Sequence, residues 1–155
     1  MIHIRPVTPA DADAWNQMRV GLWPDELPAD LATDVDSFFA GTCVHLQAAL
    51  VAENSEHELI GFAELSQRPY AEGCITSPVG FLEGWFVAPA YRGQGVGRAL
   101  VAAAEEWARG CGCTEFASDT TVDNTASAAA HQALGFEEVE IIRCFRKELG
   151  PGGNS

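Results

Sequence analysis

The sequence has little positive charge and no long apolar run. Lys147 is the only lysine among 155 residues, and 22 acidic residues against 9 basic ones give a net charge of −13. A field of this sign repels nucleic acid and attracts cations, so we expect no nucleic-acid partner, while a cationic substrate is compatible with it. No apolar stretch approaches the roughly 20 residues that span a bilayer, and the first residues lack the apolar core of a signal peptide. We therefore expect a cytoplasmic protein with no membrane partner.

The cysteines are odd in number and do not follow the spacing of metal ligands. Cys111 and Cys113 are separated by one residue rather than two, and Cys43, Cys74 and Cys144 stand alone. Reduced structural thiols are expected from such a set, and no metal site is predicted.

A chain of 155 residues is long enough for one domain with a sizeable core. We expect that domain to cover residues 1–149, and residues 150–155 to form a disordered tail. Apolar periodicity predicts the order strand, helix, helix, three strands, helix, strand, helix and one or two final strands. This order indicates an α/β (α+β) fold with one mixed sheet flanked by helices. The expected ranges are strand 2–6, helix 9–22, helix 29–40, strands 45–53, 59–66 and 79–88, helix 95–109, strand 114–118, helix 124–134 and a last strand within 136–147.

One acidic residue, Glu83, interrupts the run 79–88, which is apolar on both faces as a central strand would be. A lone carboxylate between Leu82 and Trp85 needs a partner or must be neutral, because burial disfavours the charged form. It is either a structural acid bonded to backbone or a base that takes a proton from a substrate.

The stretch from Arg92 to Gly97, Arg-Gly-Gln-Gly-Val-Gly, joins this strand to the next helix. Unpaired N–H groups and the positive end of the helix dipole meet there, and glycine lets an anion approach the backbone. The stretch lacks the Gly-Lys-Ser/Thr of a Walker loop, and its Gly-x-Gly-x-Gly differs from the Gly-x-Gly-x-x-Gly of dinucleotide-binding proteins. A phosphate or pyrophosphate cradle and a plain tight turn remain as interpretations.

Together with more distant residues, this turn resembles the GNAT superfamily of acetyl-CoA-dependent N-acetyltransferases. The resembling residues are Val87, Pro89, Arg92, Gly95, Gly97, Asn124 and Leu134-Gly135-Phe136. The resemblance implies the GNAT fold, with a mixed, mostly antiparallel central sheet and about four helices. It also implies acetyl-CoA as co-substrate and no metal. The residues implied to bind CoA are Trp85, Phe86 and Val87 along the pantetheine arm, Arg92, Gly93, Gln94, Gly95, Val96, Gly97 and Arg98 at the pyrophosphate, and Asn124, which is also explained as a helix cap.

A narrower resemblance is to the aminoglycoside 6'-N-acetyltransferases. It rests on Leu22-Trp23-Pro24, Ser77-Pro78, Phe81-Leu82-Glu83-Gly84, Ala117-Ser118-Asp119-Thr120, Asn124-Thr125 and the stretch 131–138. It implies acetyl transfer to the 6'-amino group of aminoglycosides by direct attack in a ternary complex, antibiotic resistance as the result, and a homodimer. Two other functions stay open: acetylation of another cationic amine, such as a polyamine or a peptide, and acyl-CoA sensing by a catalytically weak domain.

The same resemblance assigns roles to side chains that also have simpler structural explanations. Glu83 is the base or the anion that orients the amine, and Asp119 binds substrate amines unless it only forms an Asx turn. An aminoglycoside pocket is completed by Trp23, Tyr70 and Glu140, which are otherwise explained as a core residue, a loop anchor and a solvated strand residue. His131 stands where many GNAT enzymes have a tyrosine that protonates the departing thiolate, so the identity of that acid stays open.

Overall fold

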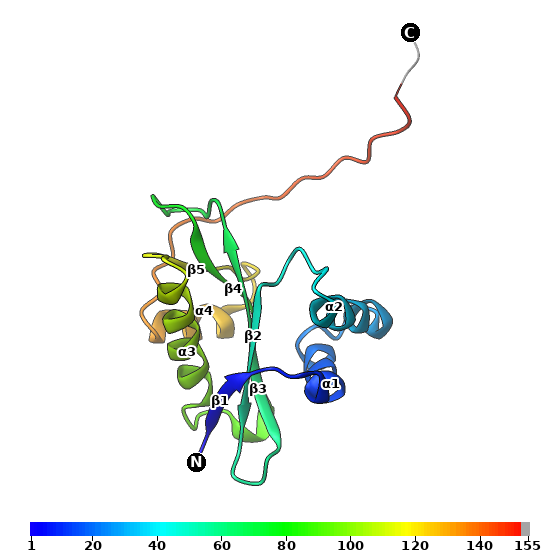
Figure 1. Ribbon diagram of the computed structural model, residues 1–155. Helices are drawn as coiled ribbons and strands as arrows, with labels where there is room; N and C mark the ends of the chain where they lie inside the picture. The colour runs from blue at the N-terminus through cyan, green and yellow to red at the C-terminus, as the bar shows by residue number, and fades with distance from the viewer. Residues whose placement is uncertain (153–155) are drawn as a thin grey trace.

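The computed structural model describes residues 1–152, and its elements follow the predicted order as far as Ala133 (Figure 1). The strands are β1 (His3–Pro6), β2 (Ala48–Glu53), β3 (Leu59–Arg68), β4 (Val79–Val87) and β5 (Phe116–Ser118). The helices are α1 (Ala12–Leu22), α2 (Pro28–Ala40), α3 (Val96–Gly110) and α4 (Thr125–Ala133), with short 3-10 helices η1 (Pro9–Asp11) and η2 (Pro89–Tyr91). No helix within residues 1–152 is both long enough and apolar enough to cross a membrane.

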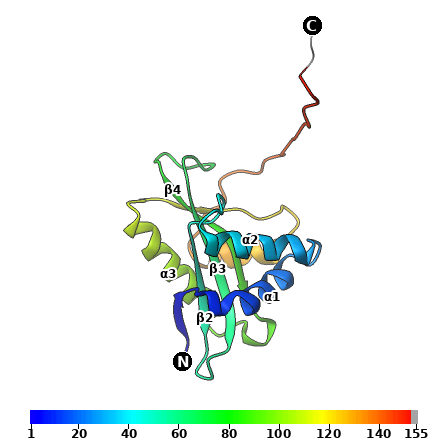
Figure 2. The same cartoon turned by 45° about the vertical axis from the view of Figure 1, so that its right-hand side comes forward.

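The strands form one sheet in the order β1-β2-β3-β4-β5. Neighbours are antiparallel from β1 to β4, and β4 pairs with β5 in parallel, so the predicted mixed, mostly antiparallel sheet is confirmed. Helices α1 and α2 lie on one face of the sheet and α3 and α4 on the other (Figures 1 and 2). This layering explains why β4 is apolar on both faces, because it is covered from both sides.

Each face of the sheet carries its own apolar core. Trp15 of α1 and Phe62 of β3 are fully buried in the core under α1 and α2, and Leu100 of α3 is fully buried in the other core. Helix α3 comes close to β4 because Gly80 has no side chain, since a Cβ there would lie 2.7 Å from the Cβ of Ala108. Strand β4 therefore lies between two helical layers.

The predicted last strand is absent from the described residues. Residues 137–152 form no helix or strand, and this segment runs away from the sheet (Figures 1 and 2). Its apolar side chains are exposed: Val139, Ile141, Ile142 and Phe145. The alternating pattern suits a strand, but a strand needs a neighbour with which to pair, and residues 1–136 do not supply one to it. Of the predicted tail, residues 153–155 lie outside the described part.

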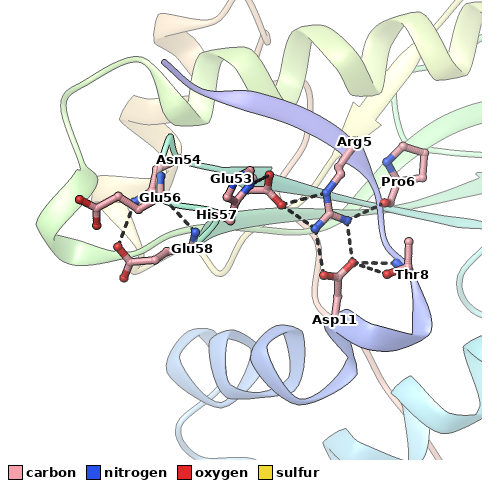
Figure 3. A network of polar contacts seen from close by, with 9 residues as sticks. All are labelled: Arg5, Pro6, Thr8, Asp11, Glu53, Asn54, Glu56, His57 and Glu58. Carbon is pink, nitrogen blue, oxygen red and sulfur yellow. Dashed lines mark hydrogen bonds and ion pairs between the residues drawn. The ribbon is translucent and has the colours of Figure 1, made fainter.

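A network of ion pairs fastens β1 to the start of α1 and to the end of β2 (Figure 3). The Arg5 guanidinium donates to both carboxylate oxygens of Asp11, at 2.7 and 3.0 Å, and to Glu53 at 2.9 Å. The backbone N–H of Thr8 donates to the same Asp11 carboxylate at 2.8 Å. The Arg5 hydrogen bonds, helped by those of Thr8 and opposed by burial, lower the pKa of Asp11 from 3.8 to about 2. The charged form of Asp11 therefore stabilises the fold.

We expect Asp11→Asn to lower the free energy of unfolding by about 2 kcal/mol at neutral pH, since one pKa unit corresponds to about 1.4 kcal/mol. Because the folded-state pKa is lowered, this contribution is complete above about pH 5 and is lost as the pH falls through 3.8 towards 2. Urea unfolding at neutral pH and at about pH 3.5 measures both values. The control is Asp13→Asn, which removes the same charge from an exposed side chain of α1. An equal loss in the control contradicts the assignment.

Candidate active site

Glu83 lies at a β-bulge, where β3 and β4 change register. Glu64 pairs with Gly84 and the next residue, Leu65, pairs with Leu82, so Glu83 is the extra residue on β4. A bulge bends its strand and turns the extra side chain in a new direction. Here the carboxylate turns towards the loop between α2 and β2. The Glu83 carboxylate and this loop border a cavity of about 370 Å³. Its lining residues are Val44, His45, Ser66, Gln67, Arg68 and Glu83.

The partner that the sequence requires for Glu83 is a pair of side chains on β3. Ser66 Oγ donates to Oε1 of Glu83 at 2.6 Å. Arg68 donates from Nε to Oε1 at 2.9 Å and from Nη2 to Oε2 at 2.8 Å. The guanidinium also lies over the ring of Phe81, 3.6 Å from its centroid. The expectation of a partner is confirmed, and the partners are side chains rather than the backbone.

The Glu83 carboxylate keeps capacity for one further donor. A carboxylate offers about four lone-pair sites, and Ser66 and Arg68 use three of them. The side chain of Glu83 is 22% exposed, so a group in the cavity can reach it. Its geometry suits an ammonium or amine that donates the fourth hydrogen bond.

Two further carboxylates, those of Asp119 and Glu72, act on Arg68 through their charge. The hydrogen bonds to Glu83 raise the pKa of Arg68, burial opposes the shift, and the charges of Glu83, Asp119 and Glu72 reinforce it. Asp119, directly after β5, therefore lies within electrostatic range of the Arg68–Glu83 pair. The structure thus brings Glu83 and Asp119 to the same end of the sheet, because Leu82, next to Glu83, pairs with Ser118, next to Asp119.

Trp23, at the end of α1, lies over β4 beside the bulge. A Cβ at Gly84 would come within 2.9 Å of the Trp23 ring, so glycine allows this approach. Helix α1 is fixed by a buried ion pair between Arg19 and Glu64, and Glu64 also accepts a hydrogen bond from the Trp15 indole at 3.0 Å. Burial raises the pKa of Glu64, and the Arg19 charge opposes that shift. The Arg19 guanidinium lies 5.0 Å from the centroid of Trp23, so the buried pair helps to position this aromatic wall.

Strand β4 parts from β5 at the bulge. The two strands pair at three positions, of which the last joins Leu82 to Ser118. Over the range 83–87, β4 has β3 on one side and no strand of the described chain on the other. Such a free edge accepts an extended chain as an added strand. The free edge is compatible with the pantetheine contacts that the resemblance implies for Trp85, Phe86 and Val87, and those contacts stay a prediction.

The turn after β4 has the features of a pyrophosphate cradle. Gly93 and Gly95 have φ values of +77° and +86°, and an added Cβ at either position would meet nothing within 4 Å. Helix α3 begins at Val96 with no side-chain hydrogen bond from its N-cap residue in the described chain. Its first N–H groups and the positive end of its dipole are therefore available to an anion. Arg92 braces the turn by donating from Nε to the Val87 carbonyl at 2.8 Å.

The other predicted CoA contacts lie around this turn or across the gap beside β4. Gln94 donates to the Ala90 carbonyl at 3.3 Å, and Arg98 is exposed in the first turn of α3. Gly97 lies against the Trp85 ring, where an added Cβ would be 3.1 Å away. Asn124 caps α4, because its side-chain oxygen accepts from the Ser127 N–H at 3.1 Å. The capping interpretation of Asn124 is thus confirmed, and its CoA contact stays a prediction.

His131, on α4, is hydrogen-bonded through both ring nitrogens. Nδ1 lies 2.7 Å from the carbonyl oxygen of Ser127, and Nε2 lies 2.8 Å from Oγ of Ser118. The edges of Trp85 and Phe136 pack around the ring, each with its centroid 5.2 Å away. Sequence reasoning missed Ser118, which stands between His131 and the gap beside β4.

A free β4 edge, an open glycine turn and a helix N-terminus together are compatible with a site for a CoA-type donor. Comparison with known protein families identifies the family of the chain. The model of the Acetyltransferase (GNAT) family matches residues 13–136. The chain belongs to this family.

Its relatives within the GNAT family agree in their names. The aminoglycoside N(6')-acetyltransferase type 1 of Klebsiella aerogenes is 53% identical over 146 residues, which are 94% of this chain and 96% of that protein. The enzyme of the same name from Stenotrophomonas maltophilia is 47% identical over 150 residues, 96% of this chain and 94% of its own.

Solved structures give the same result. AAC(6')-Iy in complex with the bisubstrate analogue CoA-S-monomethyl-acetylneamine has a TM-score of 0.87 and 38% identity, over 96% of this chain and 99% of that one. The aminoglycoside 6'-N-acetyltransferase AAC(6')-Ih from Acinetobacter baumannii has a TM-score of 0.86 and 40% identity, over 97% of this chain and 100% of that one.

Two predicted pocket residues of this GNAT protein have exposed side chains. Tyr70 is 63% exposed in the loop after β3. Glu140 is exposed on the segment that leaves the domain, next to Val139, which lies against Gly73. Their substrate contacts stay predictions. No group of three or more His, Cys, Asp or Glu side chains within residues 1–152 is placed to hold a metal ion.

We expect Gly95→Ala to weaken CoA binding about tenfold. An L-residue with positive φ costs about 1–2 kcal/mol, which the turn relieves by moving the N–H groups that face the anion. Calorimetric titration with CoA measures the change.

The matched control is Gly41→Ala at the end of α2, with φ of +74° and open space around it. It should lower the melting temperature to a similar extent and leave the Kd for CoA unchanged. Equal CoA affinity in Gly95→Ala and the unmodified protein would show that this turn is not the cradle.

Proposed function

We propose that this GNAT protein transfers the acetyl group of acetyl-CoA to the 6'-amino group of aminoglycoside antibiotics and so confers resistance to them. The observation that carries the proposal is the Glu83 carboxylate, which keeps one lone pair for an amine at the end of the free β4 edge. The names of relatives at 53% and 47% identity support the aminoglycoside as acceptor. We take residues 1–149 as one catalytic unit that acts in the cytoplasm without nucleic acid or membrane.

The acceptor side suits a polycationic sugar. Glu83 and Asp119 attract ammonium groups, and the acidic chain, with a net charge of −13, steers cations towards them. Trp23 beside the bulge supplies an aromatic wall for a sugar ring, and Tyr70 and Glu140 are proposed to complete the pocket. The proposed site therefore has carboxylates for the ammonium groups of an aminoglycoside and an aromatic surface for the face of a sugar ring.

The reaction is a direct attack of the amine on the thioester. Glu83 accepts a proton from the ammonium, directly or through one water, so that a neutral amine attacks. Backbone N–H groups near Phe86 and Val87 stabilise the negative charge that develops on the carbonyl oxygen. No side chain is acetylated in this sequence of events, so both substrates must be bound together.

A panel of amines tests the acceptor, with thiol release as the readout. Kanamycin and tobramycin should be acetylated, whereas spermidine and a kanamycin analogue with a hydroxyl at the 6' position should not. Preferred turnover of spermidine would favour a polyamine acetyltransferase. Tight CoA binding without turnover of any amine would favour the sensor function.

In the same panel, Glu83→Gln should lower kcat/KM by about 100-fold or more, since a general base contributes about 10²–10⁴. Its CoA affinity should change little, because the turn and the α3 N-terminus are untouched. Glu106→Gln, on the exposed face of α3, is the matched control and should behave as the unmodified protein does. Unchanged turnover in Glu83→Gln would remove the base assignment.

We further propose that the protein is a homodimer in which residues 137–147 pair with a second copy. Strand β5 is at the edge of the sheet, and the segment carries the alternating apolar side chains of a strand while it is exposed on its own chain. Burial of Val139, Ile141 and Phe145 against a partner would remove that apolar surface from water. Glu140, which lies on this segment, would then line the site of one of the two copies in the dimer.

Sedimentation equilibrium should give a mass of two chains for the full-length protein. The double variant Ile141→Asp and Phe145→Asp should give one chain, because a charge at each position cannot be buried against the partner. Val122→Asp, at another exposed apolar side chain, is the control and should remain dimeric. A monomeric mass for the unmodified protein would refute the dimer.

A further inference from the structure

Ser118 stands at the apex of the gap between β4 and β5. It is the last residue of β5 and pairs with Leu82, directly before the bulge residue Glu83. Its hydroxyl lies 3.2 Å from the Leu82 carbonyl oxygen and 2.8 Å from Nε2 of His131. The side chain is half-buried, so part of it is accessible. Three elements, β4, β5 and α4, thus meet at one hydroxyl group.

The hydrogen bonds define which atoms can carry protons. The Ser127 carbonyl only accepts, so Nδ1 of His131 carries a hydrogen. If the Ser118 hydroxyl donates to Leu82, as its geometry allows, then Nε2 of His131 must donate to Ser118. The hydrogen on Nε2 then has one hydrogen-bond partner, the Ser118 hydroxyl. The rings of Trp85 and Phe136 pack against the imidazole.

The position of the apex fits the leaving group. An arm bound along the free edge from Val87 towards Glu83 advances by about 3.3 Å per residue, so it ends at the bulge after about 13 Å. The bulge is also where the amine must meet the acetyl group, because Glu83 is there. The sulfur therefore comes to the side of the gap on which Ser118 lies.

The geometry points to Ser118 as the catalytic acid that protonates the departing sulfur, with His131 as the positioning residue that supplies its proton. This assignment rests on acetyl transfer from CoA and not on the identity of the amine. As the C–S bond breaks, its electron pair goes to sulfur and the Ser118 hydroxyl proton follows, which gives the free thiol. The Nε2 proton of His131 moves to Ser118 Oγ in the same event, and solvent, which takes up the protons of the amine, later returns one to His131. Atoms and charge balance without a metal or a redox partner.

The alternative is that Ser118 and His131 only hold α4 against β5. A packing role and an acid role differ in how they respond to the leaving group. A selenolate leaves without the help of a proton, so acetyl-CoA in which selenium replaces the thioester sulfur bypasses an acid. A variant that loses activity because its fold is disturbed should be impaired equally with both donors.

The test compares kcat with acetyl-CoA and with its selenium analogue. Ser118→Ala and His131→Gln should each lower kcat about 100-fold with acetyl-CoA and less than about fivefold with the analogue. Ser118→Thr keeps the hydroxyl and should recover most of the activity. Glu83→Gln is the matched comparison and should be impaired equally with both donors, because amine attack needs the base in either case.

Equal losses with both donors in Ser118→Ala and His131→Gln, or no loss in either, would overturn the assignment. Melting temperatures and CoA affinities show whether each variant is folded. If only one of the two variants folds, that variant alone is sufficient for the test. The donor ratio is measured with whichever amine of the panel is turned over. A panel that selects spermidine therefore contradicts the aminoglycoside proposal and leaves the Ser118 test in place, whereas no turnover of any amine overturns both.

Discussion

The proposed donor and acceptor sides both lie where β4 parts from β5 after three shared positions. Because the strands separate there, backbone groups of β4 that a complete sheet would pair internally are available to a ligand. The bulge at the same place turns Glu83 towards the cavity and leaves Ser118 at the apex of the gap. The bulge against β3 and the parting from β5 thus occur at the same place on β4, and together they set the two proposed sides next to each other.

The buried Arg19–Glu64 pair serves orientation more than stability. Desolvation of two charges cancels much of their attraction, so such pairs add little net stability, although removal of one partner is costly. What this pair does is fasten α1 to β3 at the height of the bulge, with Trp23 at the end of the helix. Substitutions there should be judged by substrate affinity as well as by melting temperature.

The sequence was informative where local patterns decide the structure. Periodicity predicted the elements as far as Ala133, and the stretch 92–97 predicted a turn that the glycine φ values bear out. Contacts across strands were not visible: Arg68 is 15 residues from Glu83, and the bulge that joins them is a matter of register. The prediction of a last strand was wrong for another reason. An alternating apolar pattern shows that a segment can form a strand, but it does not show which strand it would pair with.

Arg68 gives the acceptor side an internal counter-ion. The Glu83 carboxylate is already matched by a guanidinium that is held in two hydrogen bonds and lies flat on Phe81. An amine bound at Glu83, as proposed, would therefore add a fourth hydrogen bond to a carboxylate that already has a cationic partner, and would not fill a bare negative site.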